Sequence, residues 1–155
     1  MSLDLVFFEL RGRRCSLLVA AVREVVALPS VTPVPLAPST VRGVAPLHGQ
    51  VVPVLDLGVW LAPGAEPTPL SGGGNDKALL VEASLGADAT PVRAAFIVDR
   101  VMRLGTVDEG HTRPPPPGPA FVSATVLDVD GPALLIDPDR AVERVREAIR
   151  AMVRS

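Results

Sequence analysis

The stretch Val41–Leu57, with the sequence VRGVAPLHGQVVPVLDL, decides the fold that we expect for this chain. It contains two short apolar runs, Val44–Leu47 and Val51–Leu57, on either side of His48-Gly49-Gln50. Short runs rich in valine and leucine, bounded by glycine, are typical of strands joined by a tight turn. The sequence therefore predicts a β-hairpin whose turn presents His48, because loops on a rigid scaffold commonly carry recognition residues.

The composition of the 155-residue chain fits one domain, or two small lobes that share a core. Hydrophobic residues make up 48% and charged residues 21%, which provides ample material for a core and shows no sign of disorder. The net charge is −2 and aromatic residues are 3%. Nucleic-acid binding through a basic surface or stacked rings is therefore not expected.

The chain carries no signal for a membrane or an export route. No segment approaches the ~18 consecutive apolar residues that a membrane helix needs. The first ten residues include Asp4 and lack a basic region before the apolar run, unlike a signal peptide. The lone Cys15 excludes an intramolecular disulfide and is expected to be a small core residue. We therefore expect a cytoplasmic protein that does not insert into a membrane.

Short apolar runs separated by turn signals predict further strands. They cover Leu5–Leu10, Cys15–Ala20, Ala78–Ala83, Val92–Val98, Phe121–Val129 and Ala133–Ile136. Within Ala21–Leu28, three valines at positions i, i+3 and i+4 predict a short helical turn, although three valines also suit a strand. A single helical turn is expected at Val59–Ala62.

Proline and glycine mark the expected loops. Ser30–Ser39 contains three prolines and is expected to be extended. Residues 63–76 predict a flexible surface loop, since Ala78 occupies the hydroxyl position that a phosphate-binding loop needs after Lys77. The four successive prolines in Gly110–Pro119 favour polyproline II, either as an SH3 ligand or, as we prefer, as a stiff loop.

A C-terminal helix is expected over about residues 138–154. Asp137 is placed to cap it and Pro138 suits its first position. Apolar residues from Ala141 to Val153 recur at helical spacing, with arginine and glutamate on the other face. The apolar stripe is expected to dock on the chain's own core, with a partner as the alternative.

No catalytic or metal site is indicated. The two histidines, His48 and His111, and Cys15 lack the spacing of metal ligands, and no serine lies in a Gly-x-Ser-x-Gly setting. Single acids near strand ends, such as Asp56 and Asp99, are expected to accept backbone N–H bonds. We therefore expect a binding module without cofactor or metal, and a hydrolase only if the fold brings together a serine, a histidine and an acid.

The order of these motifs resembles the CheW family of chemotaxis coupling proteins and the related regulatory domain of CheA kinases, over nearly the entire chain. Val41–Leu57 resembles the family hallmark i-x-G-v-x-n-L-R-G-x-v-x-P-V-x-D-L. Val22–Val25 is similar to its V-x-E-V/I segment, and Ala95–Val101 to its g-l-x-V-D-x-V segment. Leu5–Leu10 and Phe121–Asp137 match its first strand and last hairpin.

The resemblance implies a mainly β fold with two SH3-like five-stranded β-barrel lobes packed together and a C-terminal helix. The whole chain, 1–155, would form this single domain. The lobes would divide near residues 63–76, and a return of the C-terminal segment to the first lobe stays open. Each lobe alone would be small, so the interface between them is expected to belong to one core.

The resemblance also implies a non-catalytic scaffold in cytoplasmic or membrane-anchored receptor arrays. It would link the cytoplasmic tips of methyl-accepting chemotaxis receptors to the regulatory domain of a CheA-like histidine kinase. The receptor hairpin would lie in an apolar groove between the lobes, and the kinase domain would pair barrel end to barrel end. The partner-binding positions implied by the matched motifs are Val22, Glu24, Gly43, Leu47, His48, Gly49, Val98 and Asp99.

One departure from the family pattern bears on this function. Pro46-Leu47-His48-Gly49 stands where the family has Asn-Leu-Arg-Gly. Arginine is always charged and has five donors, whereas neutral histidine has one donor and one acceptor, and losing a buried charged hydrogen bond costs roughly 1.5–3 kcal/mol. Two alternatives therefore stay open: an accessory protein of a specialised system that binds part of the usual partner set, and an SH3-like peptide-binding module unrelated to chemotaxis.

Overall fold

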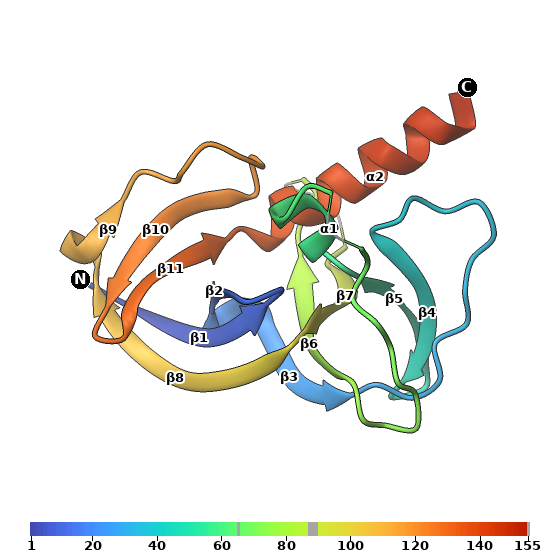
Figure 1. Cartoon of the computed structure of the whole chain (residues 1–155), viewed down its shortest axis with the longest axis horizontal. Coiled ribbons are helices and arrows are strands. Elements are labelled where there is room, and N and C mark those ends of the chain that lie inside the picture. Colours follow the sequence, from blue (N-terminus) through green and yellow to red (C-terminus); the bar gives the residue numbers. More distant parts are fainter. Residues whose placement is uncertain (65, 87–89, 155) are drawn as a thin grey trace.

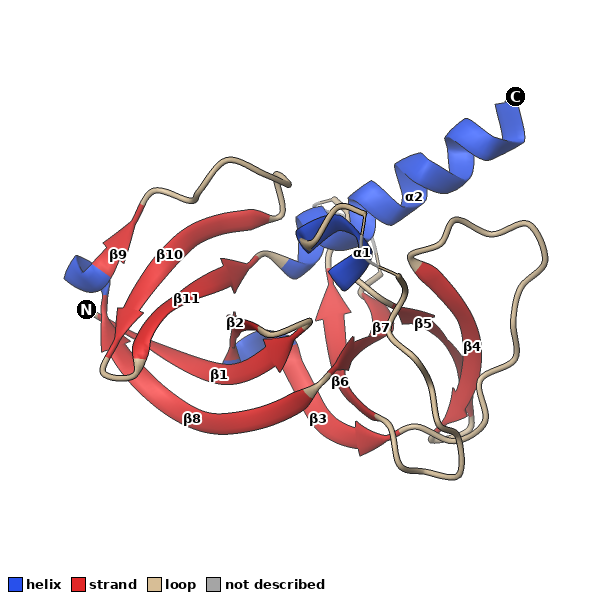
Figure 2. Ribbon diagram, in the orientation of Figure 1, coloured by secondary structure: helices blue, strands red, loops and turns tan. Residues whose placement is uncertain are grey.

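The computed structural model of the chain describes residues 1–64, 66–86 and 90–154. It shows two β-sheets and one long C-terminal helix (Figure 1). Strands dominate, and the helices are few (Figure 2). The mainly β architecture expected from the sequence is therefore confirmed.

The first sheet has six strands in the order β8-β1-β2-β11-β10-β9. Its central pairing, between β11 and β2, is parallel, and the others are antiparallel. The strands are β1 (Ser2–Leu10), β2 (Arg13–Leu18), β8 (Arg100–Asp108), β9 (Thr112–Arg113), β10 (Val122–Asp128) and β11 (Gly131–Ile136). The sixth strand, β9, has two residues, so the sheet is the expected five strands with a short addition.

The second sheet has five strands in the order β3-β6-β7-β5-β4, with β5 and β7 parallel. The strands are β3 (Val22–Ala27), β4 (Val41–Leu47), β5 (Gln50–Leu55), β6 (Lys77–Ala83) and β7 (Val92–Val98). The helical elements are α1 (Gly58–Leu61), α2 (Pro138–Arg154) and two 3-10 turns, η1 (Val19–Ala21) and η2 (Glu109–His111). The hairpin expected at Val41–Leu57 is thus β4–β5, followed by α1.

The chain passes between the sheets twice, after β2 and after β7. Residues 63–76 lie inside the second sheet's segment, between α1 and β6, so the division of lobes expected there is not where the sheets separate. The C-terminal strands return to the first sheet, where Leu134 of β11 pairs with Cys15 of β2. Such long-range pairing leaves no mark in the local sequence.

The helical turn predicted within Ala21–Leu28 is wrong, because Val22–Ala27 forms strand β3. Its ladder with β6 has a register shift between Val22 and Glu24, and this bulge interrupts the alternation of side chains. Beyond the bulge, neighbouring side chains point to opposite faces, so Val26 is buried whereas Val25 is half exposed. The three valines do not share one face, and pairing with β6 overrides the helical spacing.

The largest apolar cluster lies between the two sheets. It combines Phe8 and Leu17 from the first sheet with Leu79 and Phe96 from the second, and Val142 of α2 joins it. Each sheet also has a smaller cluster of its own on its other side. The expectation that the interface between the lobes forms part of one core is therefore confirmed.

Helix α2 begins as expected and divides into two halves. The Asp137 carboxylate accepts hydrogen bonds from the N–H groups of Asp139 and Arg140 at 2.9 and 3.3 Å, as a cap should. The first half packs on the shared core through residues such as Val142, whereas Ile149 and Val153 in the second half are exposed. Figure 1 shows this second half projecting beyond the sheets. Within the described residues, no helix has both the length and the apolar character needed to cross a membrane.

Candidate functional site

A Glu24–His48 pair forms where the two edges of the second sheet meet. Glu24 belongs to β3 and His48 follows β4, which stand at opposite ends of the strand order. The chain after β3 bridges to β4 through two backbone hydrogen bonds between Thr32 and Val44, at 2.8 and 2.9 Å. This bridge brings the edges together, and His48 Nε2 lies 2.9 Å from Glu24 Oε1. Both side chains are largely exposed, so the pair is available to a partner.

The β4–β5 turn presents His48 in a defined direction. Leu47 pairs with Gln50, which leaves His48 and Gly49 as a two-residue turn. Their φ angles are 51° and 77°, the positive pair of a type I′ hairpin turn. Leu47 is only 9% exposed and packs in the second sheet's own cluster, so the base of the turn is rigid. The structure therefore presents His48 as the sequence predicts.

Gly43 and Gly49 are each required by the fold, but for different structural reasons. Gly43 has φ 145°, and a Cβ there would lie 2.2 Å from the Thr32 carbonyl oxygen. Gly49 has φ 77° and nothing within 4 Å of its Cβ position. Gly43 is thus required by the close approach of the bridge, and Gly49 by the turn alone. Contact of either glycine with a partner remains a prediction.

Val98, Asp99 and Val22 lie at the junction of the two sheets. Val98 ends β7 with its side chain 3% exposed in the shared core, and Val22 packs against that core while half buried. Asp99 carries the chain into the first sheet: its N–H donates to the Glu9 carbonyl at 2.7 Å and its carboxylate accepts from the Gly12 N–H at 3.1 Å. Of the eight predicted positions, the structure therefore joins Glu24 to the hairpin and places these three at the crossing.

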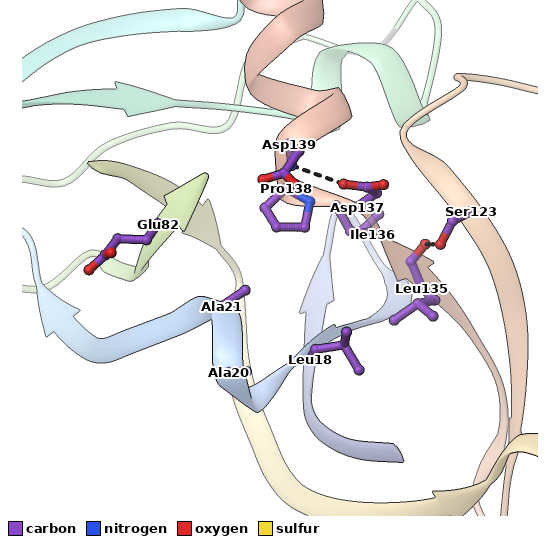
Figure 3. A pocket seen from close by; sticks show the side chains of 10 residues that line it. All are labelled: Leu18, Ala20, Ala21, Glu82, Ser123, Leu135, Ile136, Asp137, Pro138 and Asp139. Carbon is purple, nitrogen blue, oxygen red and sulfur yellow. Dashed lines mark hydrogen bonds between the residues drawn. The ribbon is translucent and has the colours of Figure 1, made fainter. Parts of the chain in front are cut away.

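A groove of about 390 Å³ opens beside this junction (Figure 3). Leu18 and Ala21, from the link between β2 and β3, form one side, and Leu135 and the start of α2 form another. Leu18 is 41% exposed, so the groove offers an apolar wall. None of the residues that line this groove could be named from the sequence, because they come from segments that are far apart in the chain.

The acidic groups around this groove are already occupied. Asp139 accepts from the Ser84 N–H at 2.7 Å, and Asp137 caps α2. Glu82 pairs with Arg23 at 3.0 Å and with Arg93 at 3.5 Å. A lining that mixes apolar side chains with three such fixed carboxylates suits the docking of a protein surface.

The described residues offer little for covalent chemistry. No three His, Cys, Asp or Glu side chains among them gather closely enough to hold a metal ion. Burial raises the pKa of the Cys15 thiol to about 12; the Asp99 charge also raises it and Arg13 opposes both. Asp56 is fully buried and accepts from the N–H groups of Gly58 and Thr68 at 2.9 and 2.7 Å, which confirms its expected backbone-binding role.

Comparisons with known proteins agree with this architecture. A family model described as the CheW-like domain matches residues 4–146. Among solved structures, the scaffolding protein TtCheW from Thermoanaerobacter tengcongensis is similar, with a TM-score of 0.72 and 29% sequence identity. The similarity covers 88% of this chain and 89% of that one. A search of the curated proteins finds no match.

Proposed function

The chain belongs to the CheW-like domain family, and on that premise we propose that it is a non-catalytic scaffold of a chemosensory array. In this role it joins the cytoplasmic tips of chemoreceptors to the regulatory domain of a CheA-like histidine kinase in the cytoplasm. The observation that carries the proposal is the meeting of Glu24 and His48 at 2.9 Å. Two separate family segments supply these residues, and they form one polar surface at the end of the second sheet.

The kinase surface in this proposal is the sheet end that carries the Glu24–His48 pair. Val51, one residue into β5, is 73% exposed and adds an apolar contact beside the turn. An exposed apolar side chain next to a polar pair matches the mixed character of transient protein interfaces. Pairing with the end of another β-rich domain there is supported by the rigid base at Leu47.

The receptor surface in this proposal is the groove of Figure 3. A helical hairpin tip carries an apolar stripe, and the apolar side chains of Leu18 and Leu135 on the two sides of the groove can take such a stripe. The groove and the Glu24–His48 pair involve different residues, so the proposal assigns each partner its own surface. A linker needs two such surfaces.

His48 favours a second candidate, an accessory scaffold that binds receptors but engages the kinase weakly. Where the family carries an arginine fork, this chain has an imidazole whose Nε2 already faces Glu24. Fewer donors are therefore left for a kinase. The two candidates make different predictions for a ternary complex.

Reconstitution tests the proposal directly. The full chain, a receptor cytoplasmic fragment and the CheA-like kinase, all from one chemosensory system, are mixed and sedimented. The scaffold predicts a ternary complex with an activated kinase, whereas the accessory protein predicts receptor binding without activation. Absence of binding to both partners refutes both candidates.

Variants then assign the surfaces by titration calorimetry. Glu24→Lys should weaken kinase binding at least about tenfold, the effect of about 1.4 kcal/mol, while receptor binding is unchanged. Glu109→Lys, an exposed acid in the first sheet's half, is the matched control. Leu18→Ser should weaken receptor binding and leave kinase binding unchanged. His48→Arg should strengthen kinase binding. Unchanged kinase affinity in both Glu24→Lys and His48→Arg would remove this surface from the explanation.

A further inference from the structure

Leu36 adopts a conformation that leucine normally avoids, and its side chain is 91% exposed. Its φ is 62°, in the left-handed region that disfavours residues with a Cβ. The Ala37 N–H donates to the Val34 carbonyl at 3.4 Å, which closes a four-residue turn. Pro35 is the second residue of this turn and Leu36 is the third. Glycine or asparagine is preferred at that position. Since burial does not compensate this strain, the leucine is better explained by something that it contacts outside the chain.

An apolar groove of about 580 Å³ begins at this leucine. The loop 34–38 forms one wall, Ile149 and Val153 of α2 form the other, and Val41 lies between them. An adjoining groove of about 460 Å³ shares Val41 and Ile149 and continues along α2 toward the shared core. In Figure 1 the loop before β4 lies beneath the projecting half of α2, which agrees with these walls. The two cavities form one trough, called here the α2 trough.

The walls of the α2 trough favour a helix over an extended segment. Pro33, Pro35 and Pro38 have no N–H groups, so a strand laid against the loop would find few backbone partners. A helix satisfies its own backbone and needs only apolar contacts. The three prolines also stiffen the loop, so the wall exists before the ligand arrives.

The charges beside the α2 trough select the partner's chemistry. Arg146 is the one charged side chain that lines either cavity within the described residues. Arg150 lies one turn further along. Glu143 pairs with Arg146 at 3.7 Å and with Arg150 at 3.5 Å, and Glu147 pairs with Arg150 at 2.8 Å. Residues 28–40 contain no charged residue. A helix with an acidic flank would place its carboxylates against Arg146, the charged side chain that lines the trough.

We propose that the α2 trough docks an amphipathic helix of a partner protein, whose apolar stripe is flanked by acidic residues and contacts Leu36. This surface is separate from the Glu24–His48 pair and from the groove beside Leu18, so it provides a third interaction. The strained leucine acts as a preformed anchor at its edge.

Two designed helical peptides with one leucine stripe test the charge rule. One has glutamate flanks and the other has lysine flanks, and each is titrated into the full-length chain by fluorescence anisotropy. The acidic peptide should bind at least about tenfold more tightly, and the difference should shrink in high salt. Equal binding of the two peptides, or no binding of the acidic one, would overturn the proposal.

Replacement of Leu36 distinguishes a role in peptide binding from a role in stability. Leu36→Gly should raise the melting temperature by about 2–4 °C, because it relieves the left-handed conformation of the leucine. The same change should weaken binding of the acidic peptide at least about tenfold. Val129→Ser, which changes an equally exposed valine in the other half of the molecule, should alter neither property. Unchanged peptide affinity in Leu36→Gly would refute the anchor.

Two other possible occupants of the α2 trough, a second copy of the chain and a lipid surface, would give results different from those of a partner helix. Sedimentation velocity would detect self-association of the chain, and flotation with phosphatidylglycerol vesicles would detect a lipid surface. Either behaviour, if Leu36→Gly abolished it, would assign the α2 trough to a second copy or to a membrane and would overturn a partner helix.

Discussion

Gly43 is expected to be the most sensitive position of the central hairpin, and Gly43→Ala tests why. A Cβ there would lie 2.2 Å from the carbonyl oxygen and 2.7 Å from the carbonyl carbon of Thr32. Contacts under 3 Å to backbone atoms cannot be relieved by rotating a side chain. The chain must therefore move Thr32 away from β4, and this opens the bridge that joins the edges of the second sheet.

The free energy follows from what the bridge contains. Two backbone hydrogen bonds join Thr32 and Val44, each worth about 0.5–1.5 kcal/mol net. The φ of 145° adds about 1–3 kcal/mol for a residue with a Cβ. Gly43→Ala should thus lower the free energy of unfolding by about 2–6 kcal/mol. Gly49→Ala, with φ 77° and open space around it, should lower it by only about 1–2 kcal/mol.

Urea unfolding followed by circular dichroism measures both values, provided that the slope with denaturant stays constant. Gly49→Ala is the matched control, because it makes the same chemical change in the same hairpin. Equal losses in the two variants would show that the Thr32 approach is not what requires Gly43. In that case partner contact would be the better explanation of this glycine.

Two further predictions concern single titratable groups. Burial raises the pKa of Asp128, but hydrogen bonds from Arg103, the Val129 N–H and Arg14 outweigh it and hold the pKa below the usual 3.8. Such a carboxylate stabilises the fold above its unfolded pKa and stops doing so as pH falls through its folded pKa. Asp128→Asn should therefore flatten the decline of unfolding free energy below about pH 4 in urea titrations, and an unaltered decline would contradict this. Because burial raises the pKa of Cys15 to about 12, Ellman's reagent should label it only as fast as the chain unfolds, and rapid labelling of the native protein would refute its burial.

The sequence predicts the individual strands and turns of this fold better than it predicts which strands pair with one another. The β4–β5 hairpin is recognisable because its turn and both strands lie within Val41–Leu57. Which strands belong to each sheet cannot be recognised from the sequence, because it depends on pairings between residues far apart in the chain, such as Leu134 with Cys15. The helical spacing of the valines in β3 misled for the same reason: pairing with β6 decides the outcome.

The candidate site shows a similar division. Glu24 and His48 could each be named from a motif, but their contact depends on the Thr32–Val44 bridge, which no motif encodes. Leu36 could not be found from the sequence, because nothing in the residue type indicates a positive φ. An exposed leucine in a proline-rich loop becomes informative only when its backbone conformation is known.

Val98 and Asp99 have visible structural roles at the junction of the sheets, and their contact with a partner stays a prediction. Val98 is buried in the shared core, and Asp99 ties the crossing to the β1–β2 hairpin through Glu9 and Gly12. This crossing fixes how the first sheet sits on the second, and the groove beside Leu18 lies at that junction. Changes at these two positions can therefore disturb partner binding without either residue touching a partner. Glu24, His48 and Asp99 are exposed and can each reach a partner directly, whereas the buried Val98 acts through the core.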